Sequence, residues 1–279
     1  AALFATRFLP GRAADGPIAA WDFDGGTGAE TKAVGRLDFV PGVSGQALKF
    51  DGLSTHLARS SSELPSVAEG FSIEAWSAPQ EYSWNRTAVL DGPGYLLGID
   101  DVGRVFLRVR SEGQWRECLS ADPLPLHRWS HMVGTFDARE GLAVFVNGRK
   151  VAFTPASGRL DEPARPPDLL VGMTRERMSP SRTERRPSEA RKSRMIFDGL
   201  LDEVRLYDRA LSSDEVARSF HSVSLPAEAP LKYRRLPEIP PGPGGFGAFF
   251  TRLKYCEEWD RLWRAAGEPD IVVRFDDSP

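Results

Sequence analysis

Short apolar or alternating runs, separated by turn residues, recur about every 10–15 residues from Ile18 to about Gly172. The runs are rich in Val, Phe, Trp and Leu, and no helical period of comparable length interrupts them. This pattern predicts an all-β fold, an antiparallel sandwich or jelly roll, and argues against alternating strands and helices. The expected strands are Ile18–Phe23, Ala47–Phe50, Thr55–Ala58, Phe71–Trp76, Thr87–Leu90, Tyr95–Ile99, Val105–Arg110, Trp115–Cys118, Trp129–Phe136, Ala143–Val146, Lys150–Phe153, Leu169–Gly172 and residues 196–208.

Two turn signals predict hairpins. Asn147-Gly148 stands between two apolar runs, which is the strongest short hairpin signal. Residues 100–103 separate Tyr95–Ile99 from Val105–Arg110 as a longer loop. Consecutive hairpins place neighbouring strands side by side in one sheet. The large apolar residues of these strands are expected to form the core between two sheets; they are Trp21, Phe23, Phe50, Phe71, Ile73, Trp76, Trp129, Val144, Val146, Val204 and Leu206.

The flanking segments differ from this pattern. Residues 1–15 are interpreted as a leader remnant or a frayed terminus. Residues 174–195 hold eight Lys or Arg against three Glu and are expected to be a flexible insertion. Ser212 with Glu215 has the spacing of a capping box and predicts a short helix that ends near His221.

These observations predict four regions. After residues 1–15, a jelly roll spans 16–222 and a proline-rich linker spans 223–245. Residues 246–279 are expected to be the incomplete opening of a second domain, or a tail that packs back on the first.

Composition excludes several classes of protein. The net charge of −3 shows no electrostatic footprint for nucleic acid. No apolar run approaches the roughly 18–20 residues that cross a bilayer. Two cysteines cannot form a disulfide framework, and no Cys/His cluster has zinc spacing.

Six segments follow one another in a recognisable order: 21–25, 45–52, 71–76, 129–137, 144–148 and 199–212. They begin with Trp-Asp-Phe-Asp-Gly and end with Gly-Leu-Leu-Asp-Glu-Val-Arg-Leu-Tyr-Asp-Arg-Ala-Leu-Ser. Their order over about residues 16–222 resembles the laminin-G-like jelly roll of the concanavalin A-like lectin/glucanase superfamily. The basic insertion before Ile196 departs from the compact form of that family.

The resemblance implies a calcium site. In relatives, Ca²⁺ lies beside the first strand and beside a strand near the end of the domain. By resemblance this points to Asp24 and Asp202, with Asp22 and Asp198 as weaker candidates. Plain alternation directs Asp202 towards the core, where a carboxylate needs a partner, backbone donors or a metal. The alternative is a salt bridge or a turn cap, since Asp24-Gly25 and Asp198-Gly199 are good turn sequences.

Carbohydrate binding is also implied by the resemblance. Sugar sites use exposed aromatic faces, and the candidates near predicted loops are Trp84, Tyr82, Trp115 and Tyr95. Trp84 is favoured because its neighbours are polar, and core packing is the alternative for each ring. If the basic insertion lies beside the binding edge, it favours an anionic polysaccharide.

No catalytic residue is expected. Retaining glucanases of this superfamily place carboxylates at alternating strand positions about 5–5.5 Å apart. Residues 258–260 begin that spacing without a third Glu, and no Gly-x-Ser-x-Gly elbow occurs. His131 lies within a predicted strand and is interpreted as structural.

The expected function is therefore a non-catalytic carbohydrate-binding or accessory module of a secreted (extracellular or periplasmic) multidomain protein associated with polysaccharide degradation. Its partners would be a glycan and a neighbouring domain of the same chain. One alternative is a structural or protein-interaction module without glycan affinity. The other is a glycoside hydrolase or polysaccharide lyase whose catalytic domain follows residue 279.

Overall fold

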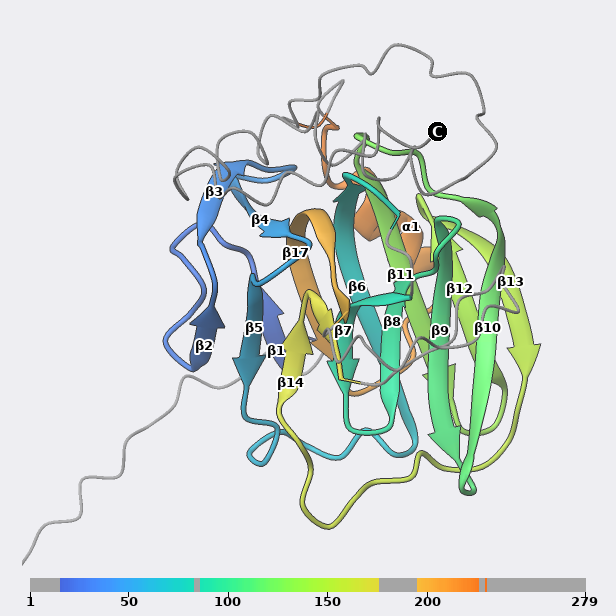
Figure 1. Cartoon of the computed structure of the whole chain (residues 1–279). Helices are drawn as coiled ribbons and strands as arrows, with labels where there is room; N and C mark the ends of the chain where they lie inside the picture. Colours follow the sequence, from blue (N-terminus) through green and yellow to red (C-terminus); the bar gives the residue numbers. More distant parts are fainter. Residues whose placement is uncertain (1–15, 83–85, 176–194, 226–228, 230–279) are drawn as a thin grey trace, which may run out of the picture. The chain divides into compact units, whose positions relative to one another are not determined.

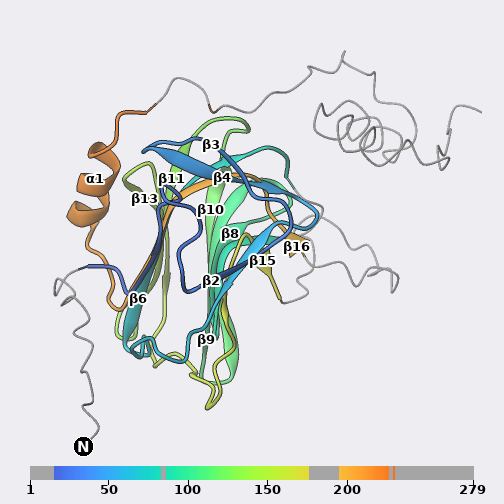
Figure 2. The same cartoon turned by 90° about the vertical axis from the view of Figure 1, so that its left-hand side faces the viewer.

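The computed structural model describes residues 16–82, 86–175, 195–225 and 229. They form two facing antiparallel sheets, which Figure 2 shows nearly edge-on with one helix on the outside. The predicted all-β sandwich is confirmed. The chain divides into two units, Ala1–Pro230 and Leu231–Pro279, and the second unit lies wholly outside the described residues. The same holds for the greater part of the predicted basic insertion.

The first sheet has the strand order β13-β12-β11-β6-β17-β4-β3, and β1 also pairs with β17 (Figure 1). Its strands are β1 (Ala19–Trp21), β3 (Asp38–Pro41), β4 (Gln46–Asp51), β6 (Gly70–Pro79), β11 (Ser130–Asp137), β12 (Gly141–Val146), β13 (Arg149–Pro155) and β17 (Asp198–Tyr207).

The second sheet has the order β10-β9-β8-β7-β14-β5-β2. Its strands are β2 (Thr31–Val34), β5 (His56–Arg59), β7 (Thr87–Gly92), β8 (Tyr95–Ile99), β9 (Arg104–Ser111), β10 (Gln114–Pro123) and β14 (Leu169–Val171). A separate pair joins β15 (Met173–Thr174) to β16 (Met195–Ile196).

Both predicted hairpins are present. Asn147 and Gly148 have φ values of 49° and 75°, which suit the tight turn between β12 and β13. Between β8 and β9, the Asp100 carboxylate accepts the backbone N–H groups of Val102 at 3.0 Å and Arg104 at 2.8 Å. Local turn chemistry therefore sets the register of both hairpins. Strands β2 and β3 were not predicted, because their short, partly exposed sequences carry little apolar signal.

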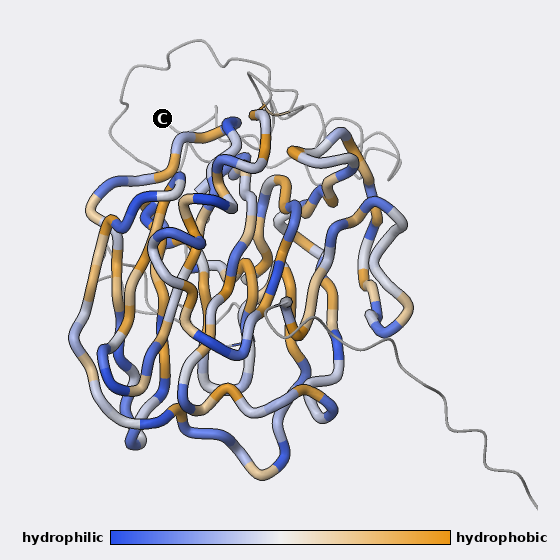
Figure 3. Tube along the Cα trace, turned by 180° about the vertical axis from the view of Figure 1, so that it is seen from behind, coloured by the Kyte–Doolittle hydropathy of each residue, from blue (hydrophilic) through white to orange (hydrophobic). Residues whose placement is uncertain are grey.

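The core lies between the sheets, and Figure 3 shows apolar segments running along the strands while polar residues gather in the turns. Phe71 is fully buried and contacts the rings of Tyr95 and Phe136, with centroids 4.6 and 5.6 Å away. Trp76 differs from the prediction. It is buried, but on the outer face of the first sheet, where it stacks on Phe220 of the helix.

The helix α1 (Ser213–His221) covers part of that outer face (Figure 2). Its predicted capping box is present: the Ser212 hydroxyl accepts the Glu215 backbone N–H, and the Glu215 carboxylate accepts the Ser212 backbone N–H at 2.8 Å. Val216 packs with Val133 and Phe145 of the sheet. Within the described residues, no helix is long and apolar enough for a membrane crossing.

A buried carboxylate ties the helix to the sheet. Glu74 of β6 accepts hydrogen bonds from Tyr207 of β17 at 2.7 Å and from Ser219 of α1, and its other close partner is the His131 ring of β11 at 2.8 Å. Arg205 lies 3.8 Å from the same carboxylate. Although burial raises the pKa of Glu74, hydrogen bonds and charge from these partners, His131 first, lower it to about 2.

Tyr207→Phe is expected to lower the free energy of unfolding by about 1–3 kcal/mol, because it removes a donor from a buried carboxylate. Urea unfolding at neutral pH measures this loss. Tyr95→Phe is the matched control, since no hydrogen bond joins the Tyr95 hydroxyl to any other described residue. Equal losses in the two variants would contradict this assignment.

The depressed pKa of Glu74 also predicts acid sensitivity. The folded value of about 2 lies below the ordinary 4.5, so the stabilisation is complete above about pH 4.5 and is lost as pH falls towards 2. About 3 kcal/mol depends on this window. Unfolding measured from pH 6 to pH 2 should therefore fall less steeply in Glu74→Gln than in the native chain, and parallel curves would refute the prediction.

Candidate functional site

Strand β17 contains a break on one edge. β4 pairs with Asp198–Leu201, whereas β1 pairs with Val204–Leu206. On the opposite edge, the register with β6 shifts between Asp202 and Arg205, and Glu203 has a φ of 50°. This is a β-bulge, which adds a residue to one strand and redirects its side chains.

The bulge corrects the expected direction of Asp202. Leu201 and Val204 both reach the core, although they are three residues apart. Asp202 lies opposite Trp76, so the two side chains share the outer face of the sheet. Asp202 is nevertheless fully buried. Simple alternation failed here because it does not anticipate an inserted residue.

The turn between β3 and β4 covers Asp202. One carboxylate oxygen of Asp202 accepts the backbone N–H groups of Val43 at 2.9 Å and Ser44 at 3.2 Å. Asp24 reaches the same turn and accepts the Gln46 N–H at 2.7 Å. A Cβ on Gly42 would lie 2.3 Å from an Asp202 oxygen, and one on Gly45 would lie 1.9 Å from an Asp24 oxygen. The two glycines therefore allow both carboxylates to approach the backbone.

Four acidic side chains gather at this break. Asp22 accepts the Asp24 N–H at 3.3 Å. Burial, with the charges of Asp22 and Asp24, raises the pKa of Glu203, which pairs with Arg205. Burial also raises the pKa of Asp202 to about 7. Sequence analysis missed Glu203, because nothing in the sequence marks the bulge that holds it there.

Asp198 lies elsewhere. It stands opposite Asp51 in the β17–β4 pairing and packs over Gly52. Four residues of strand, about 13 Å, separate it from Asp202. The structure thus groups Asp22, Asp24 and Asp202, and does not bring Asp198 to them.

Asp24 and Asp202 are the two predicted calcium ligands that approach the same turn. Ca²⁺ takes 6–8 oxygen ligands, which include carboxylates and backbone carbonyls, and here two carboxylates from separate elements meet one turn. In the described part of the chain, no group of three His, Cys, Asp or Glu side chains has metal-binding geometry. Backbone carbonyls and water would have to complete the sphere.

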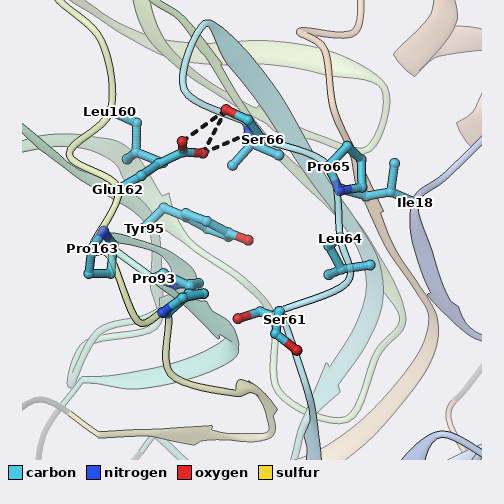
Figure 4. A pocket seen from close by; sticks show the side chains of 13 residues that line it. Ile18, Ser61, Leu64, Pro65, Ser66, Pro93, Tyr95, Leu160, Glu162 and Pro163 are labelled. Carbon is cyan, nitrogen blue, oxygen red and sulfur yellow. Dashed lines mark hydrogen bonds between the residues drawn. The ribbon is translucent and has the colours of Figure 1, made fainter.

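A pocket of about 210 Å³ lies where three connections meet at one end of the sandwich (Figures 1 and 4). The β5–β6 loop contributes Ser61, Leu64 and Ser66, the β7–β8 turn contributes Pro93, and the β13–β14 loop contributes residues 160–166. Glu162 is fixed at the wall, where it accepts the Ser66 hydroxyl at 2.9 Å and the Val67 N–H at 3.0 Å.

Tyr95 forms the base of this pocket. It is 2% exposed, and its ring packs on Phe71 and over Gly92, where a Cβ would lie 2.3 Å from the ring. Figure 4 shows its hydroxyl pointing into the pocket, towards the side where Ser61 and Leu64 lie. The predicted use of this ring as an exposed stacking face does not match its burial, whereas its hydroxyl is the part that a ligand would meet.

The other aromatic candidates lie apart from the pocket. Trp84 falls outside the described residues. Tyr82 is half-buried and donates its hydroxyl to the Leu124 carbonyl. Trp115 packs with Phe106 on the outer face of the second sheet, and the Arg108 guanidinium lies 4.5 Å from its ring centre. The Trp115 ring is therefore partly covered.

Comparison with known proteins gives one family. The family model described as concanavalin A-like lectin/glucanases superfamily matches residues 51–217. No curated protein matches the sequence.

Solved structures share the fold. Domain 4 of AbnA, an extracellular GH43 arabinanase from Geobacillus stearothermophilus, solved in complex with arabinotriose, is 18% identical with a TM-score of 0.53. The match covers 73% of this chain and 98% of that domain. The binding domain of botulinum neurotoxin serotype G is 12% identical with a TM-score of 0.54, covering 74% of this chain and 51% of that one.

A third structure is the binding domain of Paraclostridial Mosquitocidal Protein 1, which is 13% identical with a TM-score of 0.51. The match covers 69% of this chain and 47% of that domain. The chain thus spans about half the length of the toxin binding domains and nearly all of the arabinanase domain. At these identities the likeness describes the fold.

Proposed function

Since this chain belongs to the concanavalin A-like lectin/glucanases superfamily, we propose that residues 16–222 form a non-catalytic carbohydrate-binding module. The observation that carries the proposal is the pocket at Tyr95, where the Tyr95 hydroxyl and the Glu162 carboxylate stand among proline and leucine side chains. Polar groups placed among apolar side chains are typical of small-ligand sites. The arabinanase domain, which shares the fold, was solved with arabinotriose.

The pocket lacks the pair of acidic groups that glycoside hydrolysis uses. Glu162 is the one carboxylate among its 13 lining residues, all of which belong to the described part of the chain. Most families of retaining and inverting glycosidases use two carboxyl groups that flank the scissile bond. We therefore assign binding, and not bond cleavage, to this site.

The role of such a module in a longer, secreted chain would be to hold a neighbouring domain near its substrate. Linking two functions converts the second encounter into an intramolecular event and raises the effective concentration. No proton transfer is needed for that role. The module would associate with polysaccharide through its loop end, while the sandwich supplies a rigid support.

We further propose that calcium binds between Asp24 and Asp202. The cation would neutralise two carboxylates that face the turn at residues 42–46, and it would offset the cost of the buried Asp202 charge. Its contribution here is to rigidify the turn and the bulge, and it takes no part in chemistry.

The first test is affinity electrophoresis of the full 279-residue chain in gels that contain arabinan, xylan, a β-glucan or polygalacturonate. At least one neutral polysaccharide should retard the chain relative to a polysaccharide-free gel, and no new reducing ends should form. Equal mobility in every gel would reject carbohydrate binding in favour of a structural or protein-interaction module. Release of reducing ends would reject the non-catalytic assignment.

The calcium proposal predicts a thermal shift. With Ca²⁺ at a hundred times its dissociation constant, the melting temperature should rise by about 5–10 °C and return with EDTA. Asp202→Asn should abolish the shift. Asp198→Asn, which changes a carboxylate elsewhere on β17, should retain it. Identical melting curves in calcium and EDTA would show that backbone donors alone satisfy Asp202.

A further inference from the structure

Tyr95 is a buried residue whose hydroxyl has no hydrogen-bond partner among the described residues and opens onto the pocket. Its side chain is 2% exposed, and the described residues offer it no hydrogen bond. Buried tyrosine hydroxyls usually find a partner, because an unsatisfied polar group costs free energy. Here the hydroxyl instead points into the pocket (Figure 4). The pocket therefore contains a preformed hydrogen-bonding group for a ligand.

The other polar groups of the pocket mainly offer acceptors. The Ser61 hydroxyl donates to the Pro167 carbonyl at 2.8 Å, and the Ser66 hydroxyl donates to Glu162 at 2.9 Å. Their hydrogens are engaged, whereas lone pairs on both hydroxyls and on the carboxylate stay available. Burial, with the charges of Asp91 and Glu162, raises the pKa of Tyr95, so the phenol keeps its proton. A ligand thus meets one donor and several acceptors.

The charge of the pocket selects against anions. None of its 13 lining residues is Lys, Arg or His, and Glu162 places a carboxylate in the wall. A uronate or sulfate group would meet like charge without a cation to balance it. This argues against the anionic glycan that the basic insertion suggested.

The walls and the size limit the ligand further. Pro65, Pro93 and Pro163 with Leu64 present apolar surface suited to the C–H faces of a sugar. A volume of about 210 Å³ is smaller than the roughly 300–1,000 Å³ of pockets for drug-sized ligands. It accommodates a single ring and not a run of several.

We propose that this pocket binds one neutral sugar ring at the end or a branch of a glycan, with Tyr95 donating to a ring or hydroxyl oxygen and Glu162 accepting from a hydroxyl. The inference rests on the proposed function and names its ligand class. A bare ammonium ion would pair with Glu162 but would offer the Tyr95 proton no acceptor, whereas the ring and hydroxyl oxygens of a sugar can serve both groups.

The test is ligand-observed NMR of the full chain with three sets of monosaccharides: neutral (arabinose, xylose, galactose and glucose), uronic (glucuronate and galacturonate) and amino (glucosamine). At least one neutral sugar should bind, and it should bind more tightly than its uronic counterpart. Tyr95→Phe should weaken that binding about tenfold, because a sugar oxygen loses its donor while the ring and the fold remain.

Tyr207→Phe is the matched control, since it removes a hydroxyl from the Glu74 cluster and should lower stability without changing affinity. Glu162→Gln should reduce the discrimination against uronic acids, because it removes charge at nearly constant size. Unchanged neutral-sugar binding in Tyr95→Phe would refute the pocket while leaving glycan binding intact. Preference for an amino or uronic sugar would refute the ligand class. If neither sugars nor polysaccharides bind the native chain, both the pocket proposal and the proposed function are refuted.

Discussion

Strand β17 has to pair with β6 along one edge and with two different strands, β4 and β1, along the other. β4 leaves the ladder after Leu201, and β1 enters it at Val204. The bulge at Asp202 and Glu203 lies at this change of partner, and Glu203 there has a positive φ. The buried carboxylate is then satisfied by the backbone of the turn at residues 42–46. The acidic cluster thus lies where β17 changes partners, and a cation there would add to the stabilisation that the backbone donors give.

On the outer face of the same sheet, a buried pair of ionisable residues has a structural role. Glu74 and His131 are 2.8 Å apart and would resemble an acid–base pair if they lined a cleft. Both are almost completely buried. The Ser219 hydroxyl of α1 donates to Glu74 and joins the helix to the sheet, while the Tyr207 hydroxyl donates to Glu74 from β17 within the sheet. Their low-dielectric surroundings strengthen these hydrogen bonds and make loss of any one of them costly. Glu74, with His131 beside it, therefore stabilises the packing of α1 on the sheet.

The pocket lies at the loop end, away from these structural clusters. Loops that a rigid scaffold supports commonly carry binding residues, since they vary without disturbing the core. Tyr95 belongs both to the core and to the pocket: its ring packs in the core beside Phe71, and its hydroxyl points into the pocket. Such an anchored group loses little conformational freedom on binding, which favours recognition of a small, polar ligand.

Features that depend on neighbouring residues could be predicted from the sequence. The Asn147-Gly148 hairpin, the Ser212–Glu215 capping box and most core strands follow from local geometry and apolar periodicity, and six ordered segments indicated the family. The direction of Asp202, the cover over Trp115 and the free hydroxyl of Tyr95 could not be predicted. Asp202 depends on the turn at 42–46 and Tyr95 on the meeting of three loops, and these contacts join residues far apart in the chain. Trp115 depends on β9, the neighbouring strand of its own hairpin. Local chemistry specifies which elements form, whereas the packing of distant elements sets which polar groups remain for a ligand.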